Sequence, residues 1–423
     1  MTTDSSEAAE SVAGVDAEGR ELREDLLAFM RAPDPSMESD AGVDAARSGA
    51  RFDALALRVL RFQASASPVY GAFVQGRGLR PETLSHWSEF PPVPARAFRQ
   101  SPPYIAPPAP DAPGARGVPH PPQATFRTSG TTGSPGLHHV RDLSLYEASL
   151  LPPARRHLQL GGPGEHGTTT RVLALLPSPK DHPESSLAHM AGVLLDRFDD
   201  GRGGYFVTDH WEVRADAFRG ALGEAVIDGV PVLLLATAFA LVNWLDAGSG
   251  PGSGSGLAAH GGRIRLPAGS RIMETGGFKG RSRELERGEL YRRLSAALGV
   301  PGDRIVNEYG MTEMLSQFYE PVLEEGGPAD PAARRHVAPP WVRTRILDPD
   351  SLDPVPEGSP GLLCHLDLAN LYSAALLLTE DLGVAVPGPT PRHLGGFRVL
   401  GRSPGAEPRG CSLSMERWVE AVG

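Results

Sequence analysis

The stretch "TFRTSGTTGSPGLHHV" at residues 125–140 concentrates small hydroxyl side chains and glycines in one short segment. Between Thr128 and Gly136 it holds three threonines, two serines and three glycines. Glycine lets backbone N–H groups converge, and Ser and Thr hydroxyls add donors, so such a loop is suited to phosphate oxygens. The same composition also fits a flexible turn. The spacing is not G-x-x-x-x-G-K-[ST] and no lysine follows Gly133, so a Walker-type ATPase is not expected.

Composition limits the partners that such a loop could serve. The 423-residue chain has a formal net charge of −10, which argues against nucleic acid or an anionic membrane as the main partner. One local loop can still bind a small anion. Two cysteines cannot build a disulfide framework, so we expect a reducing, cytoplasmic location. The longest apolar run, at 229–245, contains a proline and an asparagine, so no membrane span is expected.

The elements that must position the loop follow from the apolar pattern. Strand-length apolar runs alternate with helical patterns, which predicts an α/β domain with a largely parallel sheet. The expected strands are 171–178, 229–236 and 270–277, and the expected helices among them are 186–198, 211–226 and 287–299. Further helices are expected at 18–32, 50–74 and 143–160, with Pro152 and Pro153 kinking or ending the last one.

Composition also predicts four segments along the chain. Residues 1–17 are expected to be a disordered acidic tail. Residues 18–123 form a helical N-terminal region and a proline-rich connector, because proline withholds the donors that helices and sheets need. Residues 124–345 form the α/β core. Residues 346–423 change to short strands and turns, so we expect a small β-rich C-terminal subdomain that carries Cys411.

Several motifs together resemble a known superfamily. "TSGTTGSPG" at 128–136, "NEYGMTEMLSQFYE" at 307–320 and "LLTEDLG" at 377–383 resemble, in this order, the adenylate-forming ligases. "FRTSGTTG", "PSPKDHPESSLAHM", "METGGFKGRSRE" and "RGCSL" are more closely similar to the LuxE-type acyl-protein synthetases. The resemblance covers roughly residues 50 to 418. It implies an adenylate-forming ligase N-terminal-type core without the full C-terminal ligase domain, since 21 residues without a lysine follow Arg402.

The resemblance implies ATP and Mg²⁺ as cofactors and assigns residues to them. Tyr309 would lie against adenine, Asp381 would bind the ribose hydroxyls with Arg402 in support, and Glu313 would hold Mg²⁺, a hard cation that prefers oxygen ligands. Thr312 would donate to the α-phosphate or to the substrate carboxylate. The loop residues for the β- and γ-phosphates would be Thr128, Ser129, Gly130, Thr131, Thr132 and Gly133, and the bend that admits substrate and adenine would be Gly276 and Gly277.

Structural interpretations of these residues stay open beside the functional ones. Tyr309 also fits the core, Glu313 a helix start and Asp381 a turn. Lys279 is one of only two lysines, so it is either a solvated loop charge or a cation retained for the carboxylate or α-phosphate. Cys411 follows Arg409 and Gly410, a setting that favours the nucleophilic thiolate. In the LuxE-type family a cysteine near the C-terminus carries the acyl group, and Cys411 matches it. Cys364, in an apolar run, is expected to be a small buried side chain.

The resemblance therefore implies ATP-dependent activation of a carboxylic acid, expected to be a fatty acid. The acyl-adenylate would pass its acyl group to the Cys411 thiol, and Cys411, Lys279 and Thr312 are the expected catalytic residues. Two alternatives remain. The acyl group could pass to an external acceptor, such as coenzyme A, a carrier protein or an amine. The chain could also be a nucleotide-binding subunit of an acyl-reductase complex, so an acyl-reductase or acyl-carrier protein is the expected partner.

Overall fold

Contacts divide the chain of the computed structural model into two units. Unit 1 comprises Met1–Ser149, Met311–Ser316 and Ala338–Gly423, and unit 2 comprises Leu150–Gly310 and Gln317–Val337. The structure describes residues 3–32, 41–106, 121–128, 135–161, 169–247, 264–276, 285–390, 395–403 and 409–422, and within these it describes no side chains for 3–15, 41–47 and 409–413. The chain passes between the units four times, so neither unit is one continuous segment.

Unit 2 is built on a six-stranded sheet in the order β5-β4-β6-β7-β8-β9. All neighbouring strands are parallel except β8 and β9. Its strands are β4 (Arg171–Leu175), β5 (Gly204–Tyr205), β6 (Val232–Thr237), β7 (Arg271–Thr275), β8 (Ile305–Tyr309) and β9 (Phe318–Tyr319). Every residue of β4 is buried, as expected for a strand covered on both faces. The predicted α/β class with a largely parallel sheet is confirmed.

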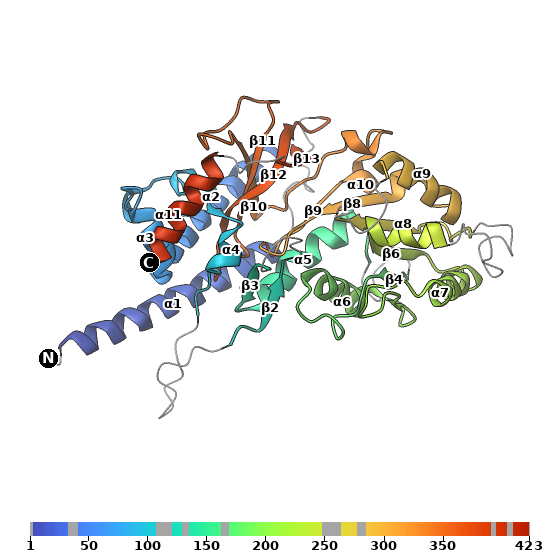
Figure 1. The fold of residues 1–423 in the computed structure, drawn as a ribbon, viewed down its shortest axis with the longest axis horizontal. Helices are drawn as coiled ribbons and strands as arrows, with labels where there is room; N and C mark the ends of the chain where they lie inside the picture. Colours follow the sequence, from blue (N-terminus) through green and yellow to red (C-terminus); the bar gives the residue numbers. More distant parts are fainter. Residues whose placement is uncertain are drawn as a thin grey trace. The chain divides into compact units, whose positions relative to one another are not determined.

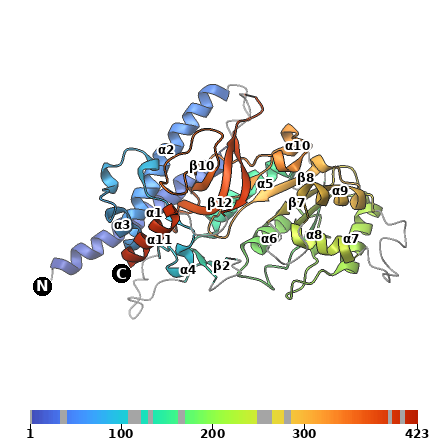
Figure 2. The same ribbon diagram turned by 45° about the horizontal axis from the view of Figure 1, so that its top comes forward.

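Three helices pack together against one face of this sheet (Figure 2). Phe218, Trp244 and Leu294, one from each helix, join alternate residues of β4, β6 and β7 in one apolar core. Alternation along a strand sends these residues to one face only. The helices are α7 (Ala215–Asp228), α8 (Ala238–Ala247) and α9 (Arg287–Leu298), while α6 (Ser186–Phe198) contacts β4 and α10 (Val322–Glu325) follows β9.

Unit 1 is built on a mixed five-stranded sheet (Figure 1). The order is β1-β12-β11-β10, and β13 also pairs with β12. Strands β10 to β13 are antiparallel to their neighbours, while β1 is parallel to β12. The strands are β1 (Val93–Pro94), β10 (Val342–Leu347), β11 (Gly361–Asp367), β12 (Leu376–Val386) and β13 (Gly396–Arg402). The short strands predicted after residue 346 are therefore present, but they share a unit with the N-terminal residues.

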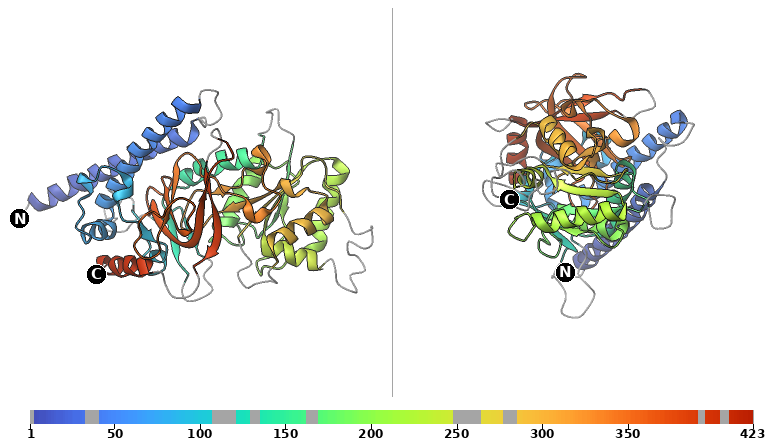
Figure 3. Two further views of the ribbon diagram at one scale, coloured as in Figure 1. Left: turned by 90° about the horizontal axis from the view of Figure 1, so that it is seen from above. Right: turned by 90° about the vertical axis from the view of Figure 1, so that its right-hand side faces the viewer.

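Helices from both ends of the chain pack in unit 1. Helices α1 and α2 run alongside each other in the left view of Figure 3. The Trp418 ring meets Phe73 edge-on at 5.3 Å between centroids, which fixes α11 to α3. The remaining elements are α1 (Thr3–Arg31), α2 (Ala41–Ala66), α3 (Pro68–Gln75), α4 (Ala97–Gln100), α11 (Arg409–Val422) and the antiparallel pair β2 (Ala124–Arg127) and β3 (Leu137–Val140).

Two local expectations differ from the structure. A disordered tail is predicted for residues 1–17, whereas α1 begins at Thr3. The alanines and glutamates of this segment are strong helix formers, which accounts for the difference. Helix α5 (Leu143–His157) continues through Pro152 and Pro153, so they do not end it. Its residues Leu150 and Ala154 are both fully buried on either side of the prolines, and packing of such a face outweighs local propensity.

The four segments expected from composition do not coincide with the two units. The expected N-terminal region and C-terminal subdomain both fall in unit 1, while the expected α/β core is divided between the units.

Among the described helices, none has the length and apolar character needed to cross a bilayer.

Candidate active site

The segment Met311–Ser316 carries Thr312 and Glu313 and belongs to unit 1. It contains no helix or strand, so side chains from elsewhere in the unit must hold it. The Asn370 side-chain amide donates to the Glu313 carbonyl at 2.9 Å, and a His138 ring nitrogen lies 2.7 Å from the Thr312 carbonyl oxygen. These two hydrogen bonds to backbone carbonyls fix the conformation of the segment at Thr312 and Glu313.

Asp367, the last residue of β11, anchors the next two residues of the segment. Its carboxylate accepts the backbone N–H groups of Leu315 at 3.1 Å and Ser316 at 2.9 Å, and the Ser316 hydroxyl at 2.7 Å. It also accepts the Ala369 N–H at 3.0 Å. Asp367 is fully buried, and burial raises the pKa of its carboxyl, while the bonds from Ser316 oppose that rise.

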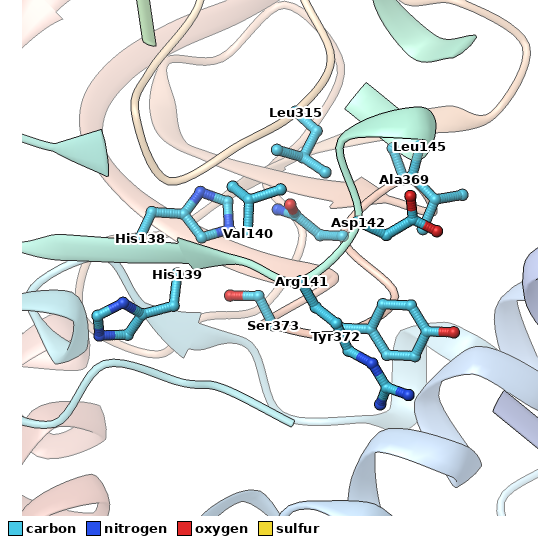
Figure 4. A pocket seen from close by; sticks show the side chains of 11 residues that line it. His138, His139, Val140, Arg141, Asp142, Leu145, Leu315, Ala369, Tyr372 and Ser373 are labelled. Atoms are coloured by element: carbon cyan, nitrogen blue, oxygen red, sulfur yellow. The ribbon is translucent and has the colours of Figure 1, made fainter. Parts of the chain in front are cut away.

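His138 on β3 links the segment to α4. Its ring meets Phe98 edge-on at 5.4 Å between centroids. Burial lowers the pKa of His138 to about 4, so the ring is neutral near pH 7 and donates Nδ1–H to the Thr312 carbonyl. His138 and His139 lie on opposite sides of β3, and a small hollow beside them reaches Asn370, Tyr372 and Ser373 (Figure 4).

The Glu313 side chain lies among charged residues of the same unit. Desolvation raises the pKa of its carboxyl to about 7, Arg402 and Arg99 lower it in part, and Asp381 raises it further. Within the described residues, the carboxylate accepts a hydrogen bond from its own backbone N–H alone. A desolvated carboxylate with open acceptor positions fits a hard cation such as Mg²⁺.

Asp381 and Arg402 are directly opposite each other on β12 and β13. Arg402 Nε lies 3.7 Å from Asp381 Oδ1. The Asp381 N–H donates to the Thr379 hydroxyl at 3.1 Å, which fixes the backbone at the acid. The Arg402 side chain is 72% exposed and that of Asp381 20%, so the pair itself adds little stability.

The two ends of the Gly/Thr loop are closed by a pair of hydrogen bonds. The Thr128 N–H donates to the Gly136 carbonyl at 2.9 Å, and the Gly136 N–H donates to the Thr128 hydroxyl at 2.8 Å. These bonds extend the β2–β3 ladder by one step. They bring Thr128 next to the point where the chain enters β3.

Unit 2 contains the two remaining described residues of the predicted site. Gly276 directly follows β7, and Tyr309 is the last residue of β8. These two strands are neighbouring and parallel, and Thr275 of β7 pairs with Glu308 of β8. Gly276 has a φ of 70°, a conformation that glycine adopts without strain. The Tyr309 ring is half-buried and lies 5.8 Å from Phe318 between centroids. Carboxyl ends of parallel strands are the usual ligand-binding edge of such sheets.

Glu308 is a buried acid at this edge to which the sequence analysis assigned no role. The Thr275 hydroxyl donates to its carboxyl. Desolvation raises the pKa of Glu308 to about 7 from the ordinary 4.5, the Thr275 bond opposes this, and the neighbouring acid Glu274 adds to it.

Replacing Glu308 with glutamine is expected to stabilise the protein at pH 8 and to leave stability nearly unchanged at pH 5. The raised pKa means that the folded state holds the proton more tightly than the unfolded chain, so stability is lost as pH rises from about 4.5 to about 7. A rise of the pKa from 4.5 to about 7 changes the free energy of unfolding by roughly 3 kcal/mol at most. Thermal unfolding of both proteins at the two pH values measures the difference, and an equal effect at both pH values would contradict the assignment.

Several predicted site residues lie outside the described residues. These are Ser129, Gly130, Thr131, Thr132, Gly133, Gly277 and Lys279. Cys411 lies in α11, whose backbone is described there, but its side chain is not. Among the described residues, Thr128, Thr312, Glu313, Asp381 and Arg402 belong to unit 1, where Glu313 lies near Asp381 and Arg402, and Gly276 and Tyr309 belong to unit 2.

The residues that hold the Thr312–Glu313 segment lie outside the motifs. Asp367 and Asn370 occur in "CHLDLAN", where an acid interrupts an apolar run. A charged residue inside a predicted buried strand is a signal for a buried hydrogen-bond network, because an unpaired buried charge is costly. His138 carries no comparable signal, since its partner is a backbone carbonyl far along the chain.

Comparison with known proteins agrees with this architecture. Residues 258–419 match the family model of LuxE, the acyl-protein synthetases. The long-chain-fatty-acid–luciferin-component ligase of Aliivibrio fischeri is 28% identical over 163 residues, which are 37% of this chain and 40% of that protein. Its namesake from Vibrio harveyi is 26% identical over 148 residues, 34% of this chain and 36% of that protein. The match thus spans about two fifths of each relative.

Solved structures extend the likeness to most of the chain. An open conformation of 2-hydroxyisobutyryl-CoA ligase, in complex with 2-HIB-AMP and CoA, has a TM-score of 0.56 at 15% identity and covers 84% of this chain and 70% of that one. The same ligase in the thioesterification state has a TM-score of 0.55 at 16% identity and covers 87% and 69%. At this identity the likeness shows the fold. The predicted resemblance is confirmed: the chain is similar to LuxE acyl-protein synthetases and has the fold of the adenylate-forming ligases.

Proposed function

We propose that the chain activates a carboxylic acid, by resemblance a fatty acid, with ATP. The substrate carboxylate oxygen attacks the α-phosphorus, the bond from that phosphorus to the bridging oxygen breaks, and pyrophosphate leaves. A thiolate then attacks the acyl carbon of the acyl-adenylate and AMP leaves. Both steps bring anions together, so positioning and charge neutralisation are expected to supply most of the rate.

The observation that carries this proposal is the convergence of charged motif residues in unit 1. Glu313 is far in the sequence from Asp381 and Arg402. The charges of Asp381 and Arg402 nevertheless both act on the Glu313 carboxyl. Two acids and two arginines thus act on one another at a single place in the unit. A nucleotide, with its ribose hydroxyls and phosphates, supplies the groups that these residues are suited to bind.

The chain's own residues take the following proposed roles. Glu313 would hold Mg²⁺, which when bound neutralises phosphate charge. Asp381 accepts hydrogen bonds from the ribose hydroxyls, with Arg402 in support. Thr312 donates to the α-phosphate or to the substrate carboxylate. By resemblance, the loop Thr128, Ser129, Gly130, Thr131, Thr132 and Gly133 holds the β- and γ-phosphates, Tyr309 lies against adenine, Gly276 and Gly277 admit the substrate, and Lys279 acts on the carboxylate or α-phosphate.

The test is whether the purified chain, given ATP, Mg²⁺ and a fatty acid, releases pyrophosphate. We expect release that depends on the acid and a matching ATP–pyrophosphate exchange. A series of aliphatic and aromatic acids would identify the substrate class. No release with any acid would overturn the proposal and favour a nucleotide-binding subunit that works only with an acyl-reductase partner.

Replacing Cys411 with serine is expected to abolish thioester labelling of the chain and to leave pyrophosphate release intact. We propose Cys411 as the acyl acceptor, because the preceding Arg409 favours its thiolate. Cys364 is the matched control, since it is buried and its replacement by serine should keep labelling. Mass spectrometry of the C-terminal peptide measures the label. Labelling that survives in the Cys411 variant would favour an external acceptor, such as coenzyme A, a carrier-protein thiol or an amine.

A further inference from the structure

Helix α4, a single turn in the proline-rich connector, is fixed beside β12. The Ala95 N–H donates to the Leu378 carbonyl at 2.9 Å, which continues the parallel pairing of β1 with β12. One residue later, Arg96 forms an ion pair with Glu380 on β12. Phe98 of α4 is fully buried. The start of α4 is therefore fixed to β12 at Leu378 and Glu380, three residues and one residue before the predicted site acid Asp381. Arg99 follows Phe98 in this helix.

That next side chain, Arg99, lies against the closing residue of the Gly/Thr loop. A Cβ placed on Gly136 would lie 3.2 Å from Arg99 Cγ and 3.1 Å from Thr128 Cγ2. These separations are tighter than most carbon–carbon contacts, and the Phe98 carbonyl carbon would also lie 3.2 Å from this Cβ, so α4 lies close against the backbone at Gly136. The aliphatic part of Arg99 is packed at the loop end, beside Thr128.

The charge of Arg99 acts on the same group of residues, because it favours the ionised form of the Glu313 carboxyl, as the charge of Arg402 does. The residue is half-buried, and within the described ranges no hydrogen bond or ion pair engages its guanidinium. Arg99 thus combines a stem packed at the loop end with a cation that no described residue engages.

We propose that Arg99 is a phosphate-binding residue of the nucleotide site. This rests on the proposed function and adds to it a cation from the N-terminal connector, a segment in which sequence motifs indicate no site. A guanidinium presents a planar fork of donors that matches two phosphate oxygens. With ATP bound, the fork would engage the phosphate chain, and Mg²⁺ held by Glu313 would then take the place of Arg99 as the positive charge beside that carboxylate.

Replacing Arg99 with alanine is expected to weaken ATP binding roughly 10- to 100-fold, the usual range for loss of a charged hydrogen bond. Adenosine, which lacks phosphates, should bind the variant as it binds the original protein. Replacing Arg99 with lysine should restore part of the ATP affinity, because lysine keeps the charge and loses the fork. The matched control is Gln100→Ala, an exposed residue of the same helix. Calorimetric titration with ATP and with adenosine measures all four proteins.

The outcomes separate this inference from the proposed function. Unchanged ATP affinity in the Arg99→Ala variant would overturn the role of Arg99 and leave the proposed function standing. An equal loss of ATP and adenosine binding would also overturn it, because Arg99 would then support the fold of the site. If the unaltered protein binds no ATP, the proposed function fails, and the role of Arg99 fails with it.

Discussion

Replacing Glu313 with glutamine is expected to lower ATP–pyrophosphate exchange by about 100- to 1,000-fold, the range seen when one preorganised charge-stabilising group is removed. Glutamine keeps the shape of the side chain and loses the negative charge that a hard cation requires. The carboxylate is the group on which Arg99, Arg402 and Asp381 all act, so its charge is central to the electrostatics of the site. Exchange measured at saturating ATP and fatty acid gives the effect.

The same variant should keep its fold. Within the described residues the Glu313 side chain accepts a bond from its own backbone alone, so no structural hydrogen bond is broken. Because burial raises the pKa of the Glu313 carboxyl to about 7, the variant's free energy of unfolding should be nearly unchanged at pH 5 and should rise at pH 8, as for Glu308. Glu357→Gln, an exposed acid of the same unit, is the control and should retain full exchange. Exchange that persists in the Glu313 variant would count decisively against the proposed nucleotide site.

Replacing Asp367 with alanine should produce the largest loss of stability, about 4 kcal/mol. The change leaves three buried N–H groups and the Ser316 hydroxyl without their acceptor, and each unsatisfied buried donor costs about 1–3 kcal/mol before water or local movement compensates. The Ser316 hydroxyl also accepts the Trp341 N–H at 3.0 Å, so the loss extends to the start of β10. Urea unfolding measures the change.

Activity should fall together with stability in this case, because Asp367 orders the backbone that follows Glu313. Asp367→Asn should lie between the alanine variant and the unaltered protein, since the amide oxygen can still accept two of the bonds. Asp350→Ala, at an exposed turn after β10, is the control and should change stability by less than about 0.5 kcal/mol. An Asp367→Ala protein that is as stable as the control would show that the hydrogen bonds to Asp367 contribute nothing to the free energy of unfolding.

The parts of the fold that could be predicted are those with a strong local pattern. Helix α6 begins and ends at the expected residues, 186 and 198, because Ser185 caps it and apolar residues repeat at helical spacing. The parallel strands β4, β6 and β7 are short apolar runs separated by helices. The chemistry was indicated by motifs whose residues are adjacent in the sequence, such as Thr312 and Glu313.

The parts that could not be predicted depend on contacts between distant residues. His138 is 174 positions from Thr312, and Asp367 is 51 from Ser316. No local pattern reveals such pairs. Arg99 lies in a proline-rich stretch that gives no periodicity, so neither its short helix nor its place beside Gly136 follows from the sequence. The site that the motifs indicate is therefore held by residues that the motifs do not include.

The discontinuity of unit 1 has a consequence for how the protein is made. Residues 93–94 pair with residues 377–378, and Gly19 accepts the Tyr372 hydroxyl at 3.0 Å, so these N-terminal contacts cannot form until residues 372–378 have left the ribosome. Residues 150–310 can meanwhile assemble their own sheet. The unit that carries Glu313 and Asp381 is thus completed later in synthesis than the parallel strands β4 to β8, and its apolar helix faces stay unpaired in the meantime.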